Sequence, residues 1–204
     1  MNSMSFFLNK AKTSSLKKSF IVVDDFYENP DYVRDFALRQ NFEKHPESHK
    51  GDRTEDRFFA PQTKEVFESI LGFKIANFYK DTSYCNGVFQ FCTARDSLVY
   101  HTDGQDWAGA VYLTPNAPYE TGTSFYAAKN SRVRHERELT PDTPDPFAGG
   151  FYDSTQFDLV DTVGNVYNRL VLWDARLIHA ASKYFGQDKE SGRLFHLFFF
   201  DLAK

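Results

Sequence analysis

Residues 193–200 read Arg-Leu-Phe-His-Leu-Phe-Phe-Phe, an apolar run headed by a charged side chain. Successive side chains of a β-strand point to opposite faces, so Arg193, Phe195, Leu197 and Phe199 share one face. A guanidinium inside an apolar interior is costly unless it meets an anion, and its fork geometry suits a carboxylate. The stretch therefore predicts a buried strand that carries one anion-binding group into the interior of a barrel.

Other short runs rich in β-branched and aromatic residues begin at about Gly87. Gly, Pro and Asp separate them, which favours a sandwich or barrel over alternating strands and helices. His196 points away from the Arg193 face, so we expect it to be a packing or surface residue. The predicted strands are residues 88–93, 98–102, 108–113, 123–127, 169–173 and 193–200.

The residues before the β-rich core are expected to form a strand and helices that pack on it and support it. Asn29 followed by Pro30 is typical of a helix start, and Gly72 is typical of a helix end. We expect an arm at 1–19, a strand at 20–23, helices at 30–41 and 62–71, and a loop at 43–57 in which His45 and His49 are solvated. The chain is then a single domain over 1–204, with the support at 20–86 and the core at 87–204.

The composition excludes several classes of function. Of the 204 residues 17% are aromatic, with 22 Phe, which is enough for one sizeable core. The net charge of −4 is not that of a nucleic-acid binder. No apolar stretch approaches the ~20 residues of a membrane span, and no signal peptide is recognisable, so a cytoplasmic location is expected. Cys85 and Cys92 lie in no redox or zinc motif, and we expect two reduced thiols.

Residues 98–103, Leu-Val-Tyr-His-Thr-Asp, contain the most informative polar pair. His101 and Asp103 lie two positions apart, so on an extended chain their side chains point to the same face and can both coordinate one metal ion. His179 follows the predicted strand 169–173 closely and is a natural third ligand. Two imidazoles and one carboxylate form the facial triad that leaves open positions on Fe(II).

In this order the motifs resemble those of the Fe(II)- and 2-oxoglutarate-dependent dioxygenases, in particular the prolyl-hydroxylase-like group with its phage and bacterial relatives. The resemblance covers roughly residues 87–201. It implies a mainly β fold, the double-stranded β-helix or jelly roll of cupin-like proteins, with N-terminal α-helices. It also implies that His101, Asp103 and His179 bind iron, and that Arg193 binds the distal carboxylate of 2-oxoglutarate. Residues 112–114, Tyr-Leu-Thr, are similar to the family's Tyr-Leu-Asn, which implies that Tyr112 shares that carboxylate.

The reaction implied by the resemblance is hydroxylation of a substrate, coupled to conversion of 2-oxoglutarate and dioxygen to succinate and CO2. Asp103 favours hydroxylation over halogenation, because halogenating relatives have a small residue in its place. The implied cofactors are Fe(II), 2-oxoglutarate and dioxygen, with ascorbate as a candidate reductant. One departure is that Phe91 or Cys92 stands where some relatives have a further cosubstrate-binding Tyr.

The substrate is not determined by these motifs, and a small molecule or a peptide side chain would both suit them. Tyr100, Trp107, Arg95, Trp173 and Arg176 flank the predicted ligands and are candidates for substrate contact, although each also suits a packing or surface role. Residues 129–150 form an insert that suits a lid, a binding loop, a disordered segment or a solvated surface loop. Two alternatives to the dioxygenase remain, an oxygen-independent cupin-like isomerase or lyase, and a non-catalytic jelly-roll binding protein.

Overall fold

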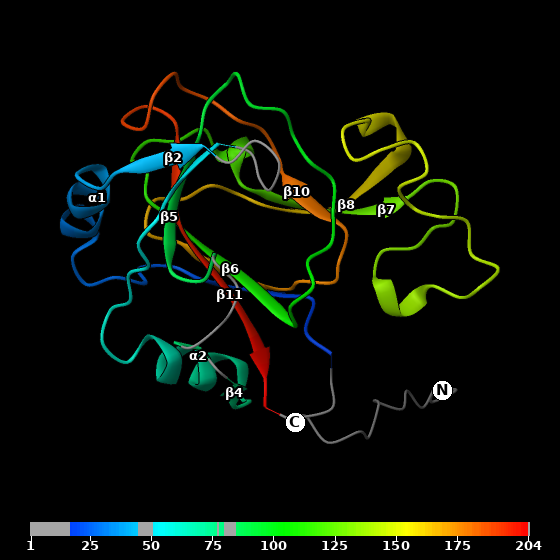
Figure 1. Ribbon diagram of the computed structural model, residues 1–204, viewed down its shortest axis with the longest axis horizontal. Coiled ribbons are helices and arrows are strands. Elements are labelled where there is room, and N and C mark those ends of the chain that lie inside the picture. Colours follow the sequence, from blue (N-terminus) through cyan, green and yellow to red (C-terminus); the bar gives the residue numbers. More distant parts are fainter. Residues whose placement is uncertain (1–16, 45–50, 77, 80–84, 204) are drawn as a thin grey trace, which may run out of the picture.

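Two antiparallel sheets form the body of the protein in the computed structural model, which describes residues 17–44, 51–76, 78–79 and 85–203 (Figure 1). The larger sheet has the strand order β1-β9-β6-β11-β5-β3-β2, with β4 also paired to β11, and the smaller sheet has the order β10-β7-β8. The strands are β1 (Phe20–Val23), β2 (Phe42–Lys44), β3 (Asp52–Thr54), β4 (Ile75–Ala76), β5 (Val88–Cys92), β6 (Trp107–Tyr112), β7 (Thr123–Ala128), β8 (Phe157–Val163), β9 (Leu170–Asp174), β10 (His179–Ala181) and β11 (Arg193–Leu202).

The strand β11 runs through the middle of the larger sheet, as its apolar sequence predicts. It pairs with β6 on one side and with β5 on the other, and its first eight residues are buried. Phe195, Leu197 and Phe199 pack between the two sheets, whereas Leu194 and Phe198 pack on the opposite face. The predicted alternation is therefore confirmed, and Arg193 lies on the face between the sheets.

Two helices cover the outer face of the larger sheet (Figure 1). The helix α1 (Pro30–Leu38) begins where Asn29 accepts a hydrogen bond from the backbone N–H of Tyr32, and it ends before the predicted Asn41. The helix α2 (Thr63–Leu71) ends at Gly72, whose φ of 77° is the left-handed conformation that glycine adopts without strain. Both helices therefore support the sheet from outside, as expected.

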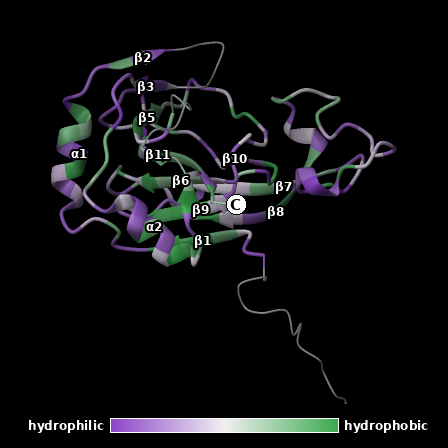
Figure 2. Cartoon of the chain, turned by 60° about the horizontal axis from the view of Figure 1, so that its bottom comes forward, coloured by the Kyte–Doolittle hydropathy of each residue, from purple (hydrophilic) through white to green (hydrophobic). Residues whose placement is uncertain are grey.

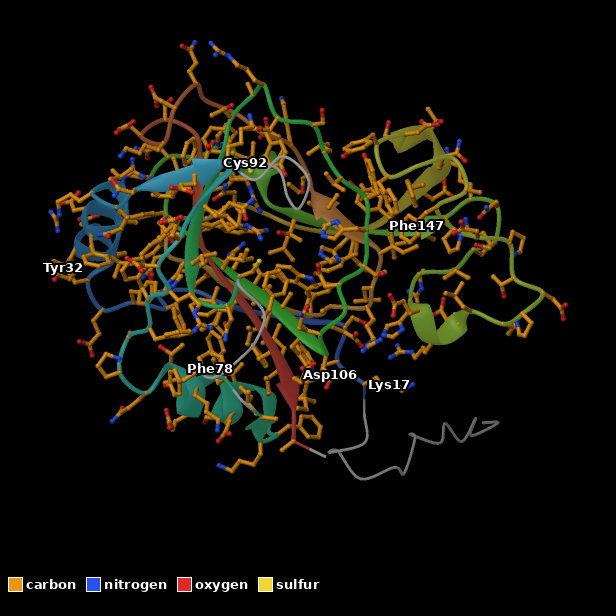
Figure 3. The ribbon with its side chains drawn as sticks, in the orientation of Figure 1. Lys17, Tyr32, Phe78, Cys92, Asp106 and Phe147 are labelled. Carbon is orange, nitrogen blue, oxygen red and sulfur yellow. The ribbon has the colours of Figure 1, made fainter. Side chains whose placement is uncertain are left out.

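The core consists of apolar side chains on both faces of the larger sheet. One cluster joins the helices to the sheet and contains Phe67, Phe78 and Phe198, with Phe78 lying next to α2 (Figure 3). A second cluster fills the space between the two sheets. In Figure 2 the strands β6 and β9 are mainly hydrophobic, while the peripheral loops are largely hydrophilic. The layered sheets are those of the predicted double-stranded β-helix.

Some predicted boundaries differ from the structure. Residues 98–102 were expected to form a strand, but only His101 forms a bridge, to His179, because the backbone N–H groups of Tyr100 and Asp103 bond to the loop carbonyls of Phe151 and Ala175. The expected loop 43–57 contains β2 and β3, which extend the larger sheet beyond β5. The strands β4, β8 and β10 were not predicted from the sequence. The expectations for residues 1–16, His45 and His49 lie outside the described residues.

The insert 129–150 between β7 and β8 packs against the end of the smaller sheet. It contains a short 3-10 helix (Glu136–Glu138), and His135 forms a bridge with Leu177. Val133 and His135 are buried, and Phe147 packs against Phe157 of β8 (Figure 3). The first half of the insert is thus bound to the body of the protein. Among the described helices, none has the length and apolar character that crossing a membrane requires.

Candidate functional site

The three predicted metal ligands lie together at one end of the space between the sheets. His101 and Asp103 belong to the segment between β5 and β6, and His179 is the first residue of β10. The backbones of His101 and His179 exchange two hydrogen bonds, of 3.1 and 2.9 Å, which hold the segments side by side. The backbone N–H of Asp103 donates to the carbonyl of Ala175. One potential ligand atom from each residue of the triad lies within 4.8 Å of the other two.

The hydrogen bonds of the two imidazoles determine which nitrogen is free to bind a metal. Nδ1 of His101 lies 3.0 Å from the carbonyl oxygen of Val99, and Nδ1 of His179 lies 2.8 Å from that of Leu177. A carbonyl can only accept, so each Nδ1 carries the proton. Both Nε2 atoms then present lone pairs toward Asp103, at 3.5 Å from Oδ1 and 3.2 Å from Oδ2. This is the tautomer that a metal-binding imidazole needs.

The environment of Asp103 suits a carboxylate that binds a cation. Its Oδ2 atom is buried and has no hydrogen-bond donor. Burial disfavours the charged form, but the two imidazoles outweigh it and hold the pKa of Asp103 well below its usual range. Burial would likewise lower the pKa of His101, but Asp103 outweighs it and raises that pKa. Two imidazole nitrogens and a buried carboxylate are ligand types that divalent transition-metal ions bind, so the residues present fit a metal centre.

The insert is tied to this cluster through Glu136. Its carboxylate accepts a hydrogen bond from Oγ1 of Thr102 at 2.6 Å, and Thr102 lies between two of the triad residues. The other carboxylate oxygen pairs with Arg176 at 3.0 Å, and Arg176 also donates to the carbonyl of Gly104. Glu136 thus holds the His101–Asp103 segment against the residues that precede His179.

Arg193 lies on the inner face of β11, where its side chain lines the same cavity as the triad. Only 4% of the residue is exposed. Nε donates to the carbonyl of Thr121 at 2.9 Å and Nη2 donates to that of Gly122 at 3.2 Å. The guanidinium stacks over the ring of Phe195, with 4.4 Å to the ring centroid. Within the described residues its partners are neutral, so its charge is available to an anion in the cavity.

Tyr112 lies beside Arg193 in the interior. Its ring centroid is 5.2 Å from the guanidinium carbon, and its hydroxyl shares a hydrogen bond of 2.8 Å with Oγ1 of Thr123. Thr123 lines the cavity, and its hydroxyl lies 3.4 Å from Nη2 of Arg193. The structure therefore brings Tyr112, Thr123 and Arg193 together, but of these three only Thr123 and Arg193 line the cavity, and Tyr112 contacts it through the Thr123 hydroxyl.

The cavity between the triad and Arg193 has a volume of about 100 Å³. This is small beside the ~300 Å³ or more that drug-sized ligands occupy. Phe195, Leu197 and Phe199 form its apolar wall, and Trp173 closes another side. The indole N–H of Trp173 is buried and has no acceptor in the described structure, so it can donate to a bound molecule.

Of the residues considered for substrate contact, Trp173 alone lines this cavity. Tyr100 packs in a separate cluster, stacked on Phe157 with 4.8 Å between the ring centroids. Trp107 is buried in the cluster on the helix side of the sheet. Arg176 is engaged with Glu136, and Arg95 borders a different depression, next to Asp96 and Asp188.

His196 lies on the outer face of β11, bonded to Tyr27, which confirms its packing role.

Arg53 and Gln90 also line the cavity, and the sequence reasoning did not identify them. Gln90 faces inward from β5, close to the Phe91 and Cys92 considered for the additional cosubstrate contact. Arg53 lies on β3, in a segment expected to be a loop. A three-residue strand at the sheet edge has too little periodicity to be predicted, so only the pairing of β3 with β5 shows that Arg53 faces the cavity. Cys85 and Cys92 are both free thiols, as predicted.

Comparison with known proteins supports the fold. No protein-family model and no curated protein matches the sequence. Among solved structures, HygX from Streptomyces hygroscopicus with nickel, 2-oxoglutarate and hygromycin B bound matches with a TM-score of 0.54 and 13% identity, covering 90% of this chain and 82% of that chain. A prolyl hydroxylase from Trichoplax adhaerens in complex with a hypoxia inducible factor peptide fragment gives a TM-score of 0.44 and 11% identity, over 90% and 84% of the two chains. The chain therefore has the double-stranded β-helix fold found in 2-oxoglutarate-binding HygX.

Proposed function

We propose that this protein is a non-haem Fe(II)- and 2-oxoglutarate-dependent dioxygenase that hydroxylates a small molecule or a peptide side chain. The observation that carries the proposal is a single cavity with two chemically distinct ends. At one end three metal-ligating side chains point to one place, and at the other a buried guanidinium has no carboxylate partner in the described structure. A dicarboxylate that also contacts the metal would satisfy both ends at once.

The residues of the chain have separable tasks in this reaction. His101, Asp103 and His179 would hold the iron through Nε2, a carboxylate oxygen and Nε2. Arg193, assisted by Thr123 and Tyr112, would bind the distal carboxylate of 2-oxoglutarate and so orient its other end toward the metal. The bound iron supplies the coupling of dioxygen reduction to the conversion of 2-oxoglutarate to succinate and CO2, with one oxygen atom going to the substrate as a hydroxyl group. The apolar wall excludes water from the cavity.

A turnover experiment with the iron-loaded protein tests the proposal. We expect succinate to form from 2-oxoglutarate, slowly without substrate and faster with one, and the Asp103→Ala variant to lose this activity. We also expect a change in the absorption spectrum when 2-oxoglutarate is added without oxygen. An iron-loaded protein that showed neither effect would contradict the proposal.

The two alternatives predict other results. A metal isomerase or lyase would need the triad, but its activity would depend neither on 2-oxoglutarate nor on dioxygen. A non-catalytic binding protein would keep its ligand affinity when His101 and His179 are replaced. The buried and unpaired Oδ2 of Asp103 favours a metal enzyme over that second alternative, because a carboxylate with a purely structural role would have a hydrogen-bond donor.

A further inference from the structure

A second arginine reaches the metal cavity from the edge of the larger sheet. Arg53 lies opposite Gln90 in the pairing of β3 with β5. Its Nε donates to Oε1 of Gln90 at 2.7 Å, and its Nη1 donates to Sγ of Cys85, also at 2.7 Å. These two bonds hold the guanidinium in one orientation beside the cavity. A guanidinium has five N–H donors, so several are left for a ligand.

The hydrogen-bond partners of Arg53 in the described structure are not carboxylates. Its two hydrogen-bond acceptors are an amide oxygen and a sulfur atom, and no described residue forms a carboxylate ion pair with it. Burial raises the pKa of Tyr184 well above its usual value and also raises that of Cys92, so both neighbours are neutral near pH 7. Asp103 is the acidic side chain that lines the cavity together with Arg53, and it belongs to the proposed metal site.

The charge balance of the loaded site points to the substrate. The two carboxylates of 2-oxoglutarate and Asp103 together carry three negative charges. A divalent metal and Arg193 carry three positive charges, so the cosubstrate complex is neutral without Arg53. Arg53 then adds one positive charge that neither the metal site nor the cosubstrate compensates, and a partly buried charge of this kind favours a ligand of opposite sign.

The position of Arg53 also suits a substrate contact. The cavity of about 100 Å³ has room for a small cosubstrate but not for a second molecule of similar size, so the substrate must bind at its mouth. The side chain of His101 is 37% exposed and that of His179 only 5% exposed, so the metal site opens on the His101 side. Arg53 is half-buried and lines the same cavity as His101 and Asp103. It therefore stands where a substrate would approach the metal.

We infer that Arg53 binds a carboxylate of the substrate and positions the substrate over the metal, so that the protein acts on a carboxylate-bearing small molecule or peptide end. That the bound carboxylate belongs to a substrate rests on the proposed dioxygenase function. The anion site at Arg53 does not depend on that function. The fork of the guanidinium, oriented by Gln90 and Cys85, is matched to the two oxygens of a carboxylate.

Binding of a simple carboxylate to the loaded protein tests this inference. The protein is loaded with zinc and saturated with 2-oxoglutarate, and saturation-transfer NMR then compares butyrate with butyramide, which has the same shape but no charge. We expect saturable binding of butyrate and none of butyramide. We expect Arg53→Met to weaken butyrate binding by at least about tenfold, as for loss of one partner of a desolvated charge pair, and Arg53→Lys to retain part of it. Arg132→Met is the matched control, because Arg132 is exposed and pairs with Asp158.

Three results would overturn the inference. If the wild-type protein binds butyrate and butyramide equally, or binds neither, there is no carboxylate site at the mouth of the cavity. This comparison needs no variant, so it does not depend on the folding of one. Undiminished butyrate binding in a folded Arg53→Met protein would place the site elsewhere. A larger loss of 2-oxoglutarate affinity than of butyrate affinity would assign Arg53 to the cosubstrate.

Failure of the inference and failure of the proposed function are distinguishable. If the iron-loaded protein converts 2-oxoglutarate to succinate but binds no carboxylate at Arg53, the dioxygenase stands and the inference is wrong. If butyrate binds through Arg53 but 2-oxoglutarate is never consumed, the anion site stands and the dioxygenase is wrong.

Discussion

Replacing Arg193 by Met should separate cosubstrate binding from stability. In the ligand-free protein Arg193 is a buried charge whose partners are backbone carbonyls. Each carbonyl has another donor, since Thr121 O also accepts from Asn165 and Gly122 O from the backbone N–H of Ser182. Methionine would therefore leave neither oxygen unpaired and would remove a desolvated charge. We expect the ligand-free variant to melt at or above the temperature of the wild type.

The loss of 2-oxoglutarate affinity can be estimated from the burial of Arg193. Removing one partner of a buried, hydrogen-bonded charge pair costs 2–5 kcal/mol, so we take about 3 kcal/mol, which is roughly a hundredfold in the dissociation constant. At a concentration one hundred times its dissociation constant, 2-oxoglutarate stabilises the wild type by about 2.7 kcal/mol, and it stabilises the variant by only about 0.4 kcal/mol. For a chain of this size these values correspond to shifts in melting temperature of roughly 8 °C and 1 °C.

Differential scanning fluorimetry of the zinc-loaded proteins measures both effects at once. Titration with 2-oxoglutarate should give the large shift in the wild type and in the exposed control Arg132→Met, and a small shift in Arg193→Met. A full ligand-induced shift in Arg193→Met would contradict the assignment of Arg193 to the cosubstrate, because 2-oxoglutarate would then bind without that guanidinium.

Two other predictions concern groups outside the cavity. Glu136→Gln keeps the shape of the side chain but weakens its bonds to Thr102 and Arg176. We therefore expect the metal affinity, measured by chelator competition, to fall by about 10–100-fold. Glu120→Gln is the exposed control, and equal metal affinities of the two variants would show that the insert does not position the triad. Burial lowers the pKa of His196 to about 4, so the unfolded chain binds its proton first and stability is lost as pH falls from about 6.5 toward 4. Between pH 7 and 4 the wild type should lose about 3 kcal/mol more unfolding free energy in urea than His196→Gln does, and parallel pH curves would contradict this.

The clustering of the three candidate metal ligands and the inward orientation of Arg193 were predictable because each residue lies in a local pattern. The spacing of His101 and Asp103 needs only an extended chain, and the inward orientation of Arg193 follows from the alternation along one long strand. The same alternation correctly separated His196 from the cavity. Here the structure adds the tautomers: the carbonyls of Val99 and Leu177 turn both Nε2 atoms toward Asp103.

Arg53 and Glu136 were not identifiable from sequence, because their roles depend on contacts between distant segments. Arg53 faces the cavity only through the pairing of the short strand β3 with β5. Glu136 lies in an insert without periodicity, yet it bonds to Thr102 across more than thirty residues of chain. The five substrate candidates were chosen for closeness in sequence to the ligands, and β-strand alternation and turns carry four of them away from the cavity lining.

A β-rich barrel with outer helices, three candidate metal ligands and one buried arginine on the inner face of a strand could be derived from the amino-acid sequence. Each of these follows from the period of the strand or the identity of a few neighbouring residues. That these groups share one small cavity, that it opens on the His101 side and that a second arginine lines it became apparent only from the folded chain. Those features depend on which strands pair and in which register, and pairing is set by the burial of the whole chain and not by any local stretch of it.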